Sequence, residues 1–368
     1  MKVLLLVGRS TGGIGHHVDR LATDLRGLGL GVTIVTDRMT ADHFGWSGAE
    51  PLWPLRPGPA ALRAPLDWHR VMLRARTVDV VHAHGHQAAV VAAVVAARAR
   101  PRPRLVVSLH NDLPPGARSG PGARLVGWAL RRADLVTGAS DDLVGLARSL
   151  GARQPRLATV ASPAIGQLLA APVASDLERA AARTRVLDGI PGTDASRPLV
   201  LTVSRIAPQK DLDTLVAAAR ESASGATWVV VGAGDETLRA ELERSASGIR
   251  LHFAGPVADI AEWLRAATVV VLTSRWEARS LVVQEAMAAG VPVVVPAVGG
   301  LPGLVADAGV VVPVGSAGAV AAAVDRLLGD PDERARRSVR GREVAAAWDT
   351  SEDEARLWVS RYRAALRP

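Results

Sequence analysis

The segment VVVLTSRWEARSLVVQEAMAAGVPVVV (Val269–Val295) decides the fold, because it reads as a strand, a helix and a second strand in immediate succession. Val269–Leu272 is an aliphatic run typical of a strand that is buried on both faces. The helix expected over Ser280–Ala289 begins at a serine that can cap it and ends at Gly290, shortly before Pro292. This order predicts parallel strands joined by a helix that covers the sheet.

The same alternation fills the rest of the chain in two blocks, which predicts two α/β domains with parallel sheets. A proline-containing stretch from Ser162 to Arg197, with one helical segment over 175–187, interrupts the rhythm and is expected to connect them. The fifteen residues Pro51–Pro65 are rich in proline and are expected to form a surface loop. The expected strands are 3–7, 32–36, 78–83, 105–109, 135–137 and 157–160, then 199–203, 228–231, 251–253, 269–272, 291–295 and 310–312. The expected helices are 16–28, 86–98, 120–132, 141–150, 211–220, 236–246, 258–266 and 280–289, with three more between 317 and 366.

Composition narrows the function classes. The net charge is +8, and much of it lies in Arg98–Arg104, Arg131-Arg132 and Arg334–Arg342. These segments are either an ordinary basic surface or contacts for an anionic membrane face or anionic substrates. No basic helix is interleaved with stacking aromatics, which argues against nucleic acid. The chain has no cysteine and its longest small apolar run, Ala88–Ala97, is too short to span a bilayer, so we expect a cytoplasmic protein, at most peripheral on the inner face of the membrane.

Lys210 is one of only two lysines among 44 cationic residues, the other being Lys2. It closes the loop Ser204–Lys210, which follows one expected strand and precedes a helix. An ammonium group is a compact charge that suits a crowded phosphate site better than a wide guanidinium fork. Arg205 and Lys210 could therefore neutralise one diphosphate; in the alternative, Arg205 merely pairs with Asp211 or Asp213.

Two carboxylates lie around the next candidate phosphate site. Glu277 precedes the helix that begins near Ser280, and Glu285 lies one to two turns inside it. Free N–H groups at such a helix start can hold a phosphate, while carboxylates accept hydrogen bonds from sugar hydroxyls. The alternative is that Glu285 is a surface helix residue and Glu277 an incidental loop acid.

The candidate site residues in the amino-terminal half of the chain are glycines and histidines. Gly12, Gly13 and Gly15 follow the first strand and allow close approach of a ligand, although their spacing is not that of a dinucleotide-binding loop. His82, His84 and His86 alternate, which would place them on one side of a strand end; a metal site there has little support, because no cysteine and no carboxylate beyond Asp79 is near. Histidines that end a strand or begin a helix, His110 and His17, are expected to face the same region.

Taken in order, these motifs resemble the retaining glycosyltransferases with the GT-B fold, the bacterial mannosyl- and glucosyltransferases that use nucleotide-diphosphate sugars. The resemblance covers about residues 1–366 and is most specific between 199 and 300. It rests on Ser204–Lys210, Gly232-Ala-Gly234, Phe253–Val257, Glu277-x7-Glu285 with Ala286–Val293, Gly12–Val18 and Asp79–Gly85.

The resemblance implies two Rossmann-like domains with a cleft between them. The expected parts are an acceptor-side domain over 1–165, a linker over 166–198, a donor domain over 199–345 and a last helix within 346–368 that crosses back. The implied reaction moves a hexose to an unknown hydroxyl acceptor with retention. It needs no metal and no cofactor other than the sugar nucleotide as co-substrate. A lipid or envelope glycan as the acceptor is a separate hypothesis, which fits the basic segments.

The resemblance also implies roles for individual residues. Arg205, Lys210 and the helix start at Ser280 would bind the donor diphosphate, and Glu285 the ribose. Glu277 would contact the transferred sugar as a catalytic residue together with His110. Pro256 and Val257 would lie near the base, and Gly12, Gly13 and Gly15 near the sugar and acceptor.

Two departures from the family pattern leave alternatives open. Ala278-Arg279-Ser280 stands where the family commonly has Gly-Phe-Gly, and Ala161–Ala164 where it often has Asn-Gly. The first departure keeps open a catalytically weak relative that binds nucleotide sugars as a partner subunit. A sugar-nucleotide epimerase would need its own acid and base, and a nicotinamide dehydrogenase lacks the glycine fingerprint.

Overall fold

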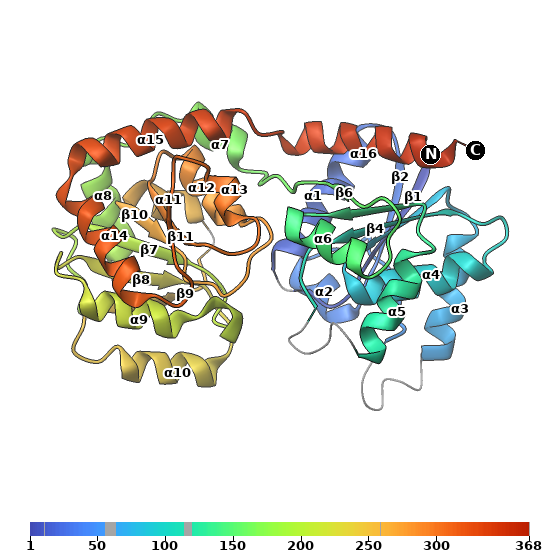
Figure 1. Cartoon of the computed structure of the whole chain (residues 1–368), viewed down its shortest axis with the longest axis horizontal. Helices are drawn as coiled ribbons and strands as arrows, with labels where there is room; N and C mark the ends of the chain where they lie inside the picture. The colour runs from blue at the N-terminus through green and yellow to red at the C-terminus, as the bar shows by residue number, and fades with distance from the viewer. Residues whose placement is uncertain (11, 56–63, 114–119, 258, 368) are drawn as a thin grey trace. The chain divides into compact units, whose positions relative to one another are not determined.

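The computed structural model describes residues 1–10, 12–55, 64–113, 120–257 and 259–367 (Figure 1). The chain forms two compact units, Met1–Ala161 with Asp349–Pro368, and Ser162–Trp348. Each unit contains one six-stranded sheet in which every pair of neighbouring strands is parallel. The α/β class with two parallel sheets is therefore confirmed.

The first unit has the strand order β2-β1-β3-β4-β5-β6. Its strands are β1 (Lys2–Val7), β2 (Gly31–Val35), β3 (Val80–His84), β4 (Arg104–Leu109), β5 (Leu135–Gly138) and β6 (Arg156–Leu157). Its helices are α1 (Gly13–Gly27), α2 (Arg38–His43), α3 (Ala64–Ala75), α4 (His86–Arg98), α5 (Pro121–Leu130), α6 (Asp141–Ser149) and α16 (Ser351–Leu366). The short helix α2 was not predicted. The expected loop over 51–65 lies partly outside the described residues, and its last two positions already belong to α3.

The second unit has the strand order β12-β11-β10-β7-β8-β9. Its strands are β7 (Leu199–Val203), β8 (Thr227–Val231), β9 (Leu251–Gly255), β10 (Val269–Val271), β11 (Val293–Pro296) and β12 (Val310–Val312). Its helices are α7 (Ile165–Ala170), α8 (Asp176–Leu187), the 3-10 turn η2 (Pro208–Lys210), α9 (Leu212–Glu221), α10 (Glu236–Ser245), α11 (Ile260–Ala266), α12 (Leu281–Ala288), α13 (Leu301–Val305), α14 (Ala317–Gly329) and α15 (Pro331–Ala346).

The segment 166–198, expected to be a linker, is instead an integral part of the second unit. Ser175 and Glu178 form a capping box that starts α8, and buried Leu187 at its end packs in the same core as Leu199. The prolines that suggested an open connection delimit helices here, since proline stops a helix without preventing the chain from packing.

Both sheets reverse their strand order at one place, and these places position the candidate site. In the second unit the chain runs outward through β7, β8 and β9, then returns to place β10 on the other side of β7. In the first unit β1 lies between β2 and β3. Ligands of open parallel sheets bind beyond the carboxyl ends of the strands at such a reversal. The loops after β7 and β10, and those after β1 and β3, are therefore the places to examine.

Helix α16 supplies a large part of the first unit's core. Trp358 and Tyr362 are fully buried, and they pack in one cluster with residues of β1 and α1. Tyr362 also places its hydroxyl 2.7 Å from Nδ1 of His82. The last sixteen-residue helix is thus part of the hydrophobic core of the amino-terminal sheet.

We expect Trp358→Ala to destabilise the first unit by about 3–5 kcal/mol, because it removes a fully buried indole and leaves a cavity. Leu357→Ala is the matched control, since Leu357 lies next to it on α16 and is 43% exposed. The control should change the unfolding free energy by no more than about 0.5 kcal/mol. Denaturant unfolding of both variants measures the difference, and equal losses would contradict the role assigned to Trp358.

Candidate functional site

In the second unit, the loops after β7 and β10 are tied together by three hydrogen bonds. Gln209 donates its side-chain amide to the Trp276 carbonyl at 2.7 Å, and its own carbonyl accepts from the Arg275 N–H at 2.9 Å. The Thr273 hydroxyl donates to the Lys210 carbonyl at 3.0 Å. These bonds fix the two loops at the strand-order reversal, where the sequence placed the candidate diphosphate site.

Lys210 and Glu277 meet within this pair of loops. The Lys210 ammonium forms an ion pair with Oε1 of Glu277, and the Ser274 hydroxyl donates to the same oxygen at 2.9 Å. The two side chains are only 15% and 12% exposed. Because two charges removed from water in this way require each other, the pair holds a cation and a carboxylate in fixed positions side by side. The structure thus brings together two residues that the sequence assigned to neighbouring parts of one donor.

Arg205, on the same loop, is exposed and makes no ion pair with any described residue. Asp211, its alternative partner, is buried and pairs with Arg275 at 3.2 Å. The pairing of Arg205 with Asp211 or Asp213 is therefore not what the described residues show. The guanidinium of Arg205 is left available to a ligand.

Glycines allow these loops to approach neighbouring backbone. A Cβ atom at Gly232 would lie 2.0 Å from the Ser204 carbonyl oxygen, so the loop after β8 packs directly on the one that carries Arg205. Gly299 has a φ of +51°, and a Cβ there would lie 1.8 Å from the Glu277 carbonyl oxygen. Gly300 donates its N–H to that oxygen at 3.0 Å. Sequence reasoning missed Gly299 and Gly300, although a Gly-Gly pair in the loop that follows a strand was a visible signal.

Glu285 lies on α12, half-buried, with an unexpected partner. The Ser162 hydroxyl donates to its Oε1 at 2.5 Å. Burial raises the pKa of Glu285, while the hydrogen bond from Ser162 opposes that rise. Ser162 stands in the segment Ala161–Ala164, which departs from the family's Asn-Gly, and it contacts the predicted ribose-binding residue. Nothing in the sequence alone connected residues 123 positions apart.

The remaining predicted donor residues lie at ends of elements in this unit. Ser280 is the N-cap residue of α12 and is buried, without a hydrogen bond from its side chain to the helix. Pro256 and Val257 directly follow the end of β9, the former exposed and the latter half-buried. Both places are at the carboxyl edge of the sheet.

In the first unit, three buried histidines gather at the carboxyl ends of β3 and β4. His84 Nδ1 lies 3.0 Å from His110 Nε2, and the ring of His17 on α1 lies 5.1 Å from that of His110. Ligand nitrogens of these three histidines all lie within 4.8 Å of one another. Nε2 of His17 and Nε2 of His84 have no hydrogen-bond partner among the described residues. The triad is the one group in the described part of the chain that could hold a metal ion, and independence from metals stays a prediction.

Not all the alternating histidines belong to this triad. His82 is held by Tyr362 and by the Ser108 hydroxyl, which lies 2.7 Å from its Nε2. His86 begins α4 and lies 2.6 Å from the Asn111 carbonyl instead. The prediction that His82, His84 and His86 lie together on one side is therefore wrong for His86, because the chain turns into a helix at Gly85.

Burial determines the charge of the histidines. It lowers the pKa of His82, His84 and His110 well below the ordinary value, and the positive charge that each neighbouring imidazole would carry lowers it further. All three rings are therefore neutral near pH 7. A neutral His110 can donate a hydrogen bond from one ring nitrogen and accept one at the other.

The predicted glycine loop opens α1. Gly12 is its N-cap residue and Gly13 its first residue. A Cβ atom at Gly15 would lie 2.1 Å from the Phe44 ring, so this glycine makes room for Phe44.

Comparisons with known proteins identify the family of the chain. Residues 197–330 match the family model described as glycosyl transferases group 1, and residues 12–163 match a glycosyl transferase 4-like domain. The chain is 30% identical over 366 residues to the alpha-maltose-1-phosphate synthase of Mycolicibacterium smegmatis, covering 90% of each protein. It is 38% identical over 197 residues to the D-inositol 3-phosphate glycosyltransferase of Frankia alni, covering 48% of each. The matches to three relatives of that name span 48%, 60% and 44% of their lengths.

Among solved structures, the chain is similar to Anabaena HepE in complex with UDP-glucose, with a TM-score of 0.84 at 22% identity over 99% of this chain and 100% of that one. That similarity shows the fold. The chain therefore belongs to the group 1 glycosyltransferases and has the GT-B fold.

We expect Glu285→Gln to stabilise the second unit increasingly as the pH rises through the raised pKa of Glu285. A folded-state pKa above the unfolded value means that the carboxyl contributes stability when protonated and loses it on ionisation, a cost that the neutral amide avoids. Thermal unfolding of both proteins between pH 4 and pH 8 measures the change in their stability difference. Each unit by which the folded-state pKa exceeds the unfolded-state pKa corresponds to about 1.4 kcal/mol. A stability difference that does not change with pH would contradict the assignment.

Proposed function

We propose that this protein transfers a hexose from a nucleotide-diphosphate sugar to a hydroxyl acceptor with retention of configuration. The observation that carries the proposal is the buried pair of Lys210 and Glu277, held between two loops at the strand-order reversal of the second unit. The names of its relatives support it, since they describe a glycosyltransferase and a maltose 1-phosphate synthase. The UDP-glucose bound to HepE supports a nucleotide-sugar donor.

In this proposal the donor's negative charge is held by the second unit. Arg205 and Lys210 neutralise the diphosphate, together with the N–H groups at the start of α12 near Ser280. Glu285 accepts hydrogen bonds from the ribose hydroxyls. Pro256 and Val257 lie near the base.

The sugar lies next to Glu277, whose carboxylate accepts hydrogen bonds from its hydroxyls. The bond between the anomeric carbon and the diphosphate oxygen breaks, and the diphosphate leaves with the electron pair. The acceptor hydroxyl oxygen bonds to the anomeric carbon from the same face, and its proton passes to the departing diphosphate oxygen. Fixed cations stabilise the charge that develops on the leaving group, so we propose that no metal is needed.

We assign the first unit to the acceptor. In this proposal His110, neutral and hydrogen-bonded to His84, supplies a hydrogen-bonding group for the acceptor, and Gly12, Gly13 and Gly15 at the start of α1 belong to the same acceptor site. A lipid or an envelope glycan is the acceptor class that we propose.

The second candidate is a nucleotide-sugar-binding relative with weak activity, which Arg279 had suggested. The Arg279 guanidinium lies over the Trp348 ring, 5.3 Å from its centroid. A cation held on an aromatic face is less available to fill a sugar pocket, which favours the transferase. We therefore expect the natural chain, with Arg279 in place, to transfer the sugar. If the natural chain shows no transfer and the Arg279→Phe variant does, the weak relative is favoured.

The first experiment is a thermal-shift screen against UDP, GDP, ADP and their common sugars. We expect one nucleotide to stabilise the protein, because a ligand that binds only the folded state raises its melting temperature. Lys210→Ala and Glu285→Ala should each abolish the shift, whereas Lys2→Ala, the matched loss of the only other lysine, should retain it. Equal losses for Lys210→Ala and Lys2→Ala would contradict the donor site.

We also propose peripheral contact with an anionic membrane through the basic segments of the first unit. None of the described helices combines the length and the apolar character that crossing a bilayer requires. We expect flotation with anionic vesicles and little with neutral ones, because surface arginines are attracted to anionic headgroups. Equal recovery with both would contradict this contact.

A further inference from the structure

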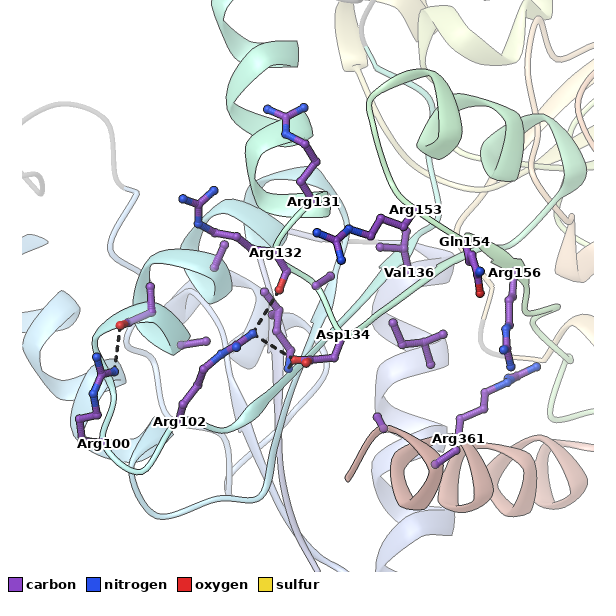
Figure 2. Close-up of a pocket in the computed structure, with 18 residues that line it drawn as sticks. Arg100, Arg102, Arg131, Arg132, Asp134, Val136, Arg153, Gln154, Arg156 and Arg361 are labelled. Atoms are coloured by element: carbon purple, nitrogen blue, oxygen red, sulfur yellow. Dashed lines mark hydrogen bonds and ion pairs between the residues drawn. The ribbon is translucent and has the colours of Figure 1, made fainter. Parts of the chain in front are cut away.

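A cavity of about 940 Å³ opens in the first unit, away from its histidine cluster (Figure 2). Its walls come from the residues before β4 and β5, from the start of β6 and from the last turns of α4 and α16. His84 and His110 lie at the opposite, carboxyl ends of β3 and β4. The cavity therefore lies at the other edge of the same sheet.

The lining carries much more positive than negative charge. It contains seven arginines and a single carboxylate, that of Asp134. The arginines are Arg100, Arg102, Arg131, Arg132, Arg153, Arg156 and Arg361. Asp134 is already occupied, since it pairs with Arg104 at 3.0 Å and with Arg102 at 3.4 Å and accepts from the Leu105 N–H at 2.7 Å. It leaves most of the positive charge uncompensated.

Among the described residues, Arg102 pairs with Asp134, whereas the other six arginines of the lining form no ion pair. They include Arg153, Arg156 and Arg361. Figure 2 shows Arg156 and Arg361 side by side at one end of the cavity. Burial lowers the pKa of Arg361; the carboxylates of Glu354 and Asp349 oppose that change, and the positive charge of Arg156 adds to it. The proximity of Arg156 and Arg361 costs free energy that a bound anion would recover.

An abundance of arginine in the chain does not explain this arrangement. The basic helix α15 of the second unit is also rich in arginine, but there Arg337 pairs with Glu333 at 2.8 Å and Arg340 with Asp307 at 2.9 Å. In the first unit outside the cavity, Arg74 pairs with Glu50 at 2.7 Å. The lining of the cavity differs from these places because it gathers seven arginines around a single carboxylate.

Several of the guanidinium groups are held in position. Arg132 lies over the Trp128 ring at 4.3 Å and Arg361 over the Trp358 ring at 4.8 Å, which fixes their planes and leaves their N–H edges free. Arg131 donates to the Leu150 carbonyl at 3.2 Å, and Arg102 to the Arg132 carbonyl at 3.3 Å. Positioned forks of this kind match the oxygens of phosphate groups.

We propose that this cavity is a binding site for a polyanion that carries two or more phosphate charges. Its volume is sufficient for a small phosphorylated molecule, and the same chemistry would accept the headgroup of an anionic phospholipid. The site lies outside the donor loops of the second unit and does not depend on the reaction proposed for them.

The test compares the full-length chain with two double variants of equal charge. Arg153→Ala/Arg156→Ala removes two unpaired arginines of the cavity, and Arg244→Ala/Arg336→Ala removes two exposed arginines of the second unit. Calorimetric titration with tripolyphosphate at physiological ionic strength measures binding of a free polyanion. Flotation with vesicles of phosphatidylcholine, with and without phosphatidylglycerol, measures binding of a lipid headgroup. Any binding of tripolyphosphate by the donor loops is common to all three proteins, so only their differences report on the cavity.

We expect the cavity variant to bind at least about tenfold more weakly in one of the two assays, because two charge-assisted contacts are lost, while the control variant is unchanged. Loss in calorimetry identifies a free phosphorylated ligand, and loss in flotation alone identifies a lipid headgroup. The proposal is overturned if the natural chain binds neither probe, or if both variants lose binding equally. Should the alanine variant fail to fold by circular dichroism, Arg153→Gln/Arg156→Gln replaces it with the same expected outcomes.

Discussion

The ion pair of Lys210 with Glu277 depends on a topological constraint that organises the whole second unit. Because β10 returns to the free side of β7, the loops after these two strands leave the sheet side by side. Only there can two segments 67 residues apart exchange three hydrogen bonds and bury a cation against a carboxylate. Gly232 and Gly299 serve the same arrangement, since any side chain at either position would collide with the carbonyl of a neighbouring loop.

In the first unit, several of the buried ionisable groups are histidines, and among the described residues none of these has an ion-pair partner as close as the one that Lys210 has in Glu277. His82, His84 and His110 are buried close together, so a proton on any of these three would be poorly solvated and repelled by neighbouring imidazoles. A buried neutral imidazole is stabilised by hydrogen bonds to its nitrogens, and α16 supplies one for His82 through Tyr362. Glu354 on the same helix is also buried and accepts from the Ala161 N–H at 3.1 Å and from Trp358 at 3.3 Å. The carboxyl-terminal helix therefore stabilises polar groups of the sheet as well as covering its apolar face.

Much of the fold followed from local patterns, because strands buried on both faces and helices with a cap and a glycine stop leave clear signals between neighbours in sequence. Lys210, Glu277 and Ser280 could be placed near one another for the same reason: each follows a predicted strand end or opens a predicted helix. The contacts that sequence reasoning missed join distant segments, as Ser162 does with Glu285 and Tyr362 with His82. No periodicity encodes such pairs. The proline-containing segment 166–198 was misjudged because composition reports where helices stop and not whether the chain between them packs.

The chain uses its two kinds of cation differently, and the structure gives a physical reason. In the loops of the second unit, the single ammonium group of Lys210 pairs with the Glu277 oxygen that also accepts from the Ser274 hydroxyl, a place that suits a compact charge better than a planar fork. The arginine-lined cavity is open and wide, and there the fork is the better group, because it can rest on an aromatic ring and still present two N–H donors outward. A genome that favours arginine would explain the number of arginines in the chain. It would not explain why seven of them line one cavity with a single carboxylate. That crowding is unfavourable in the absence of an anion, so its presence in a well-packed sheet domain points to a ligand that offsets it.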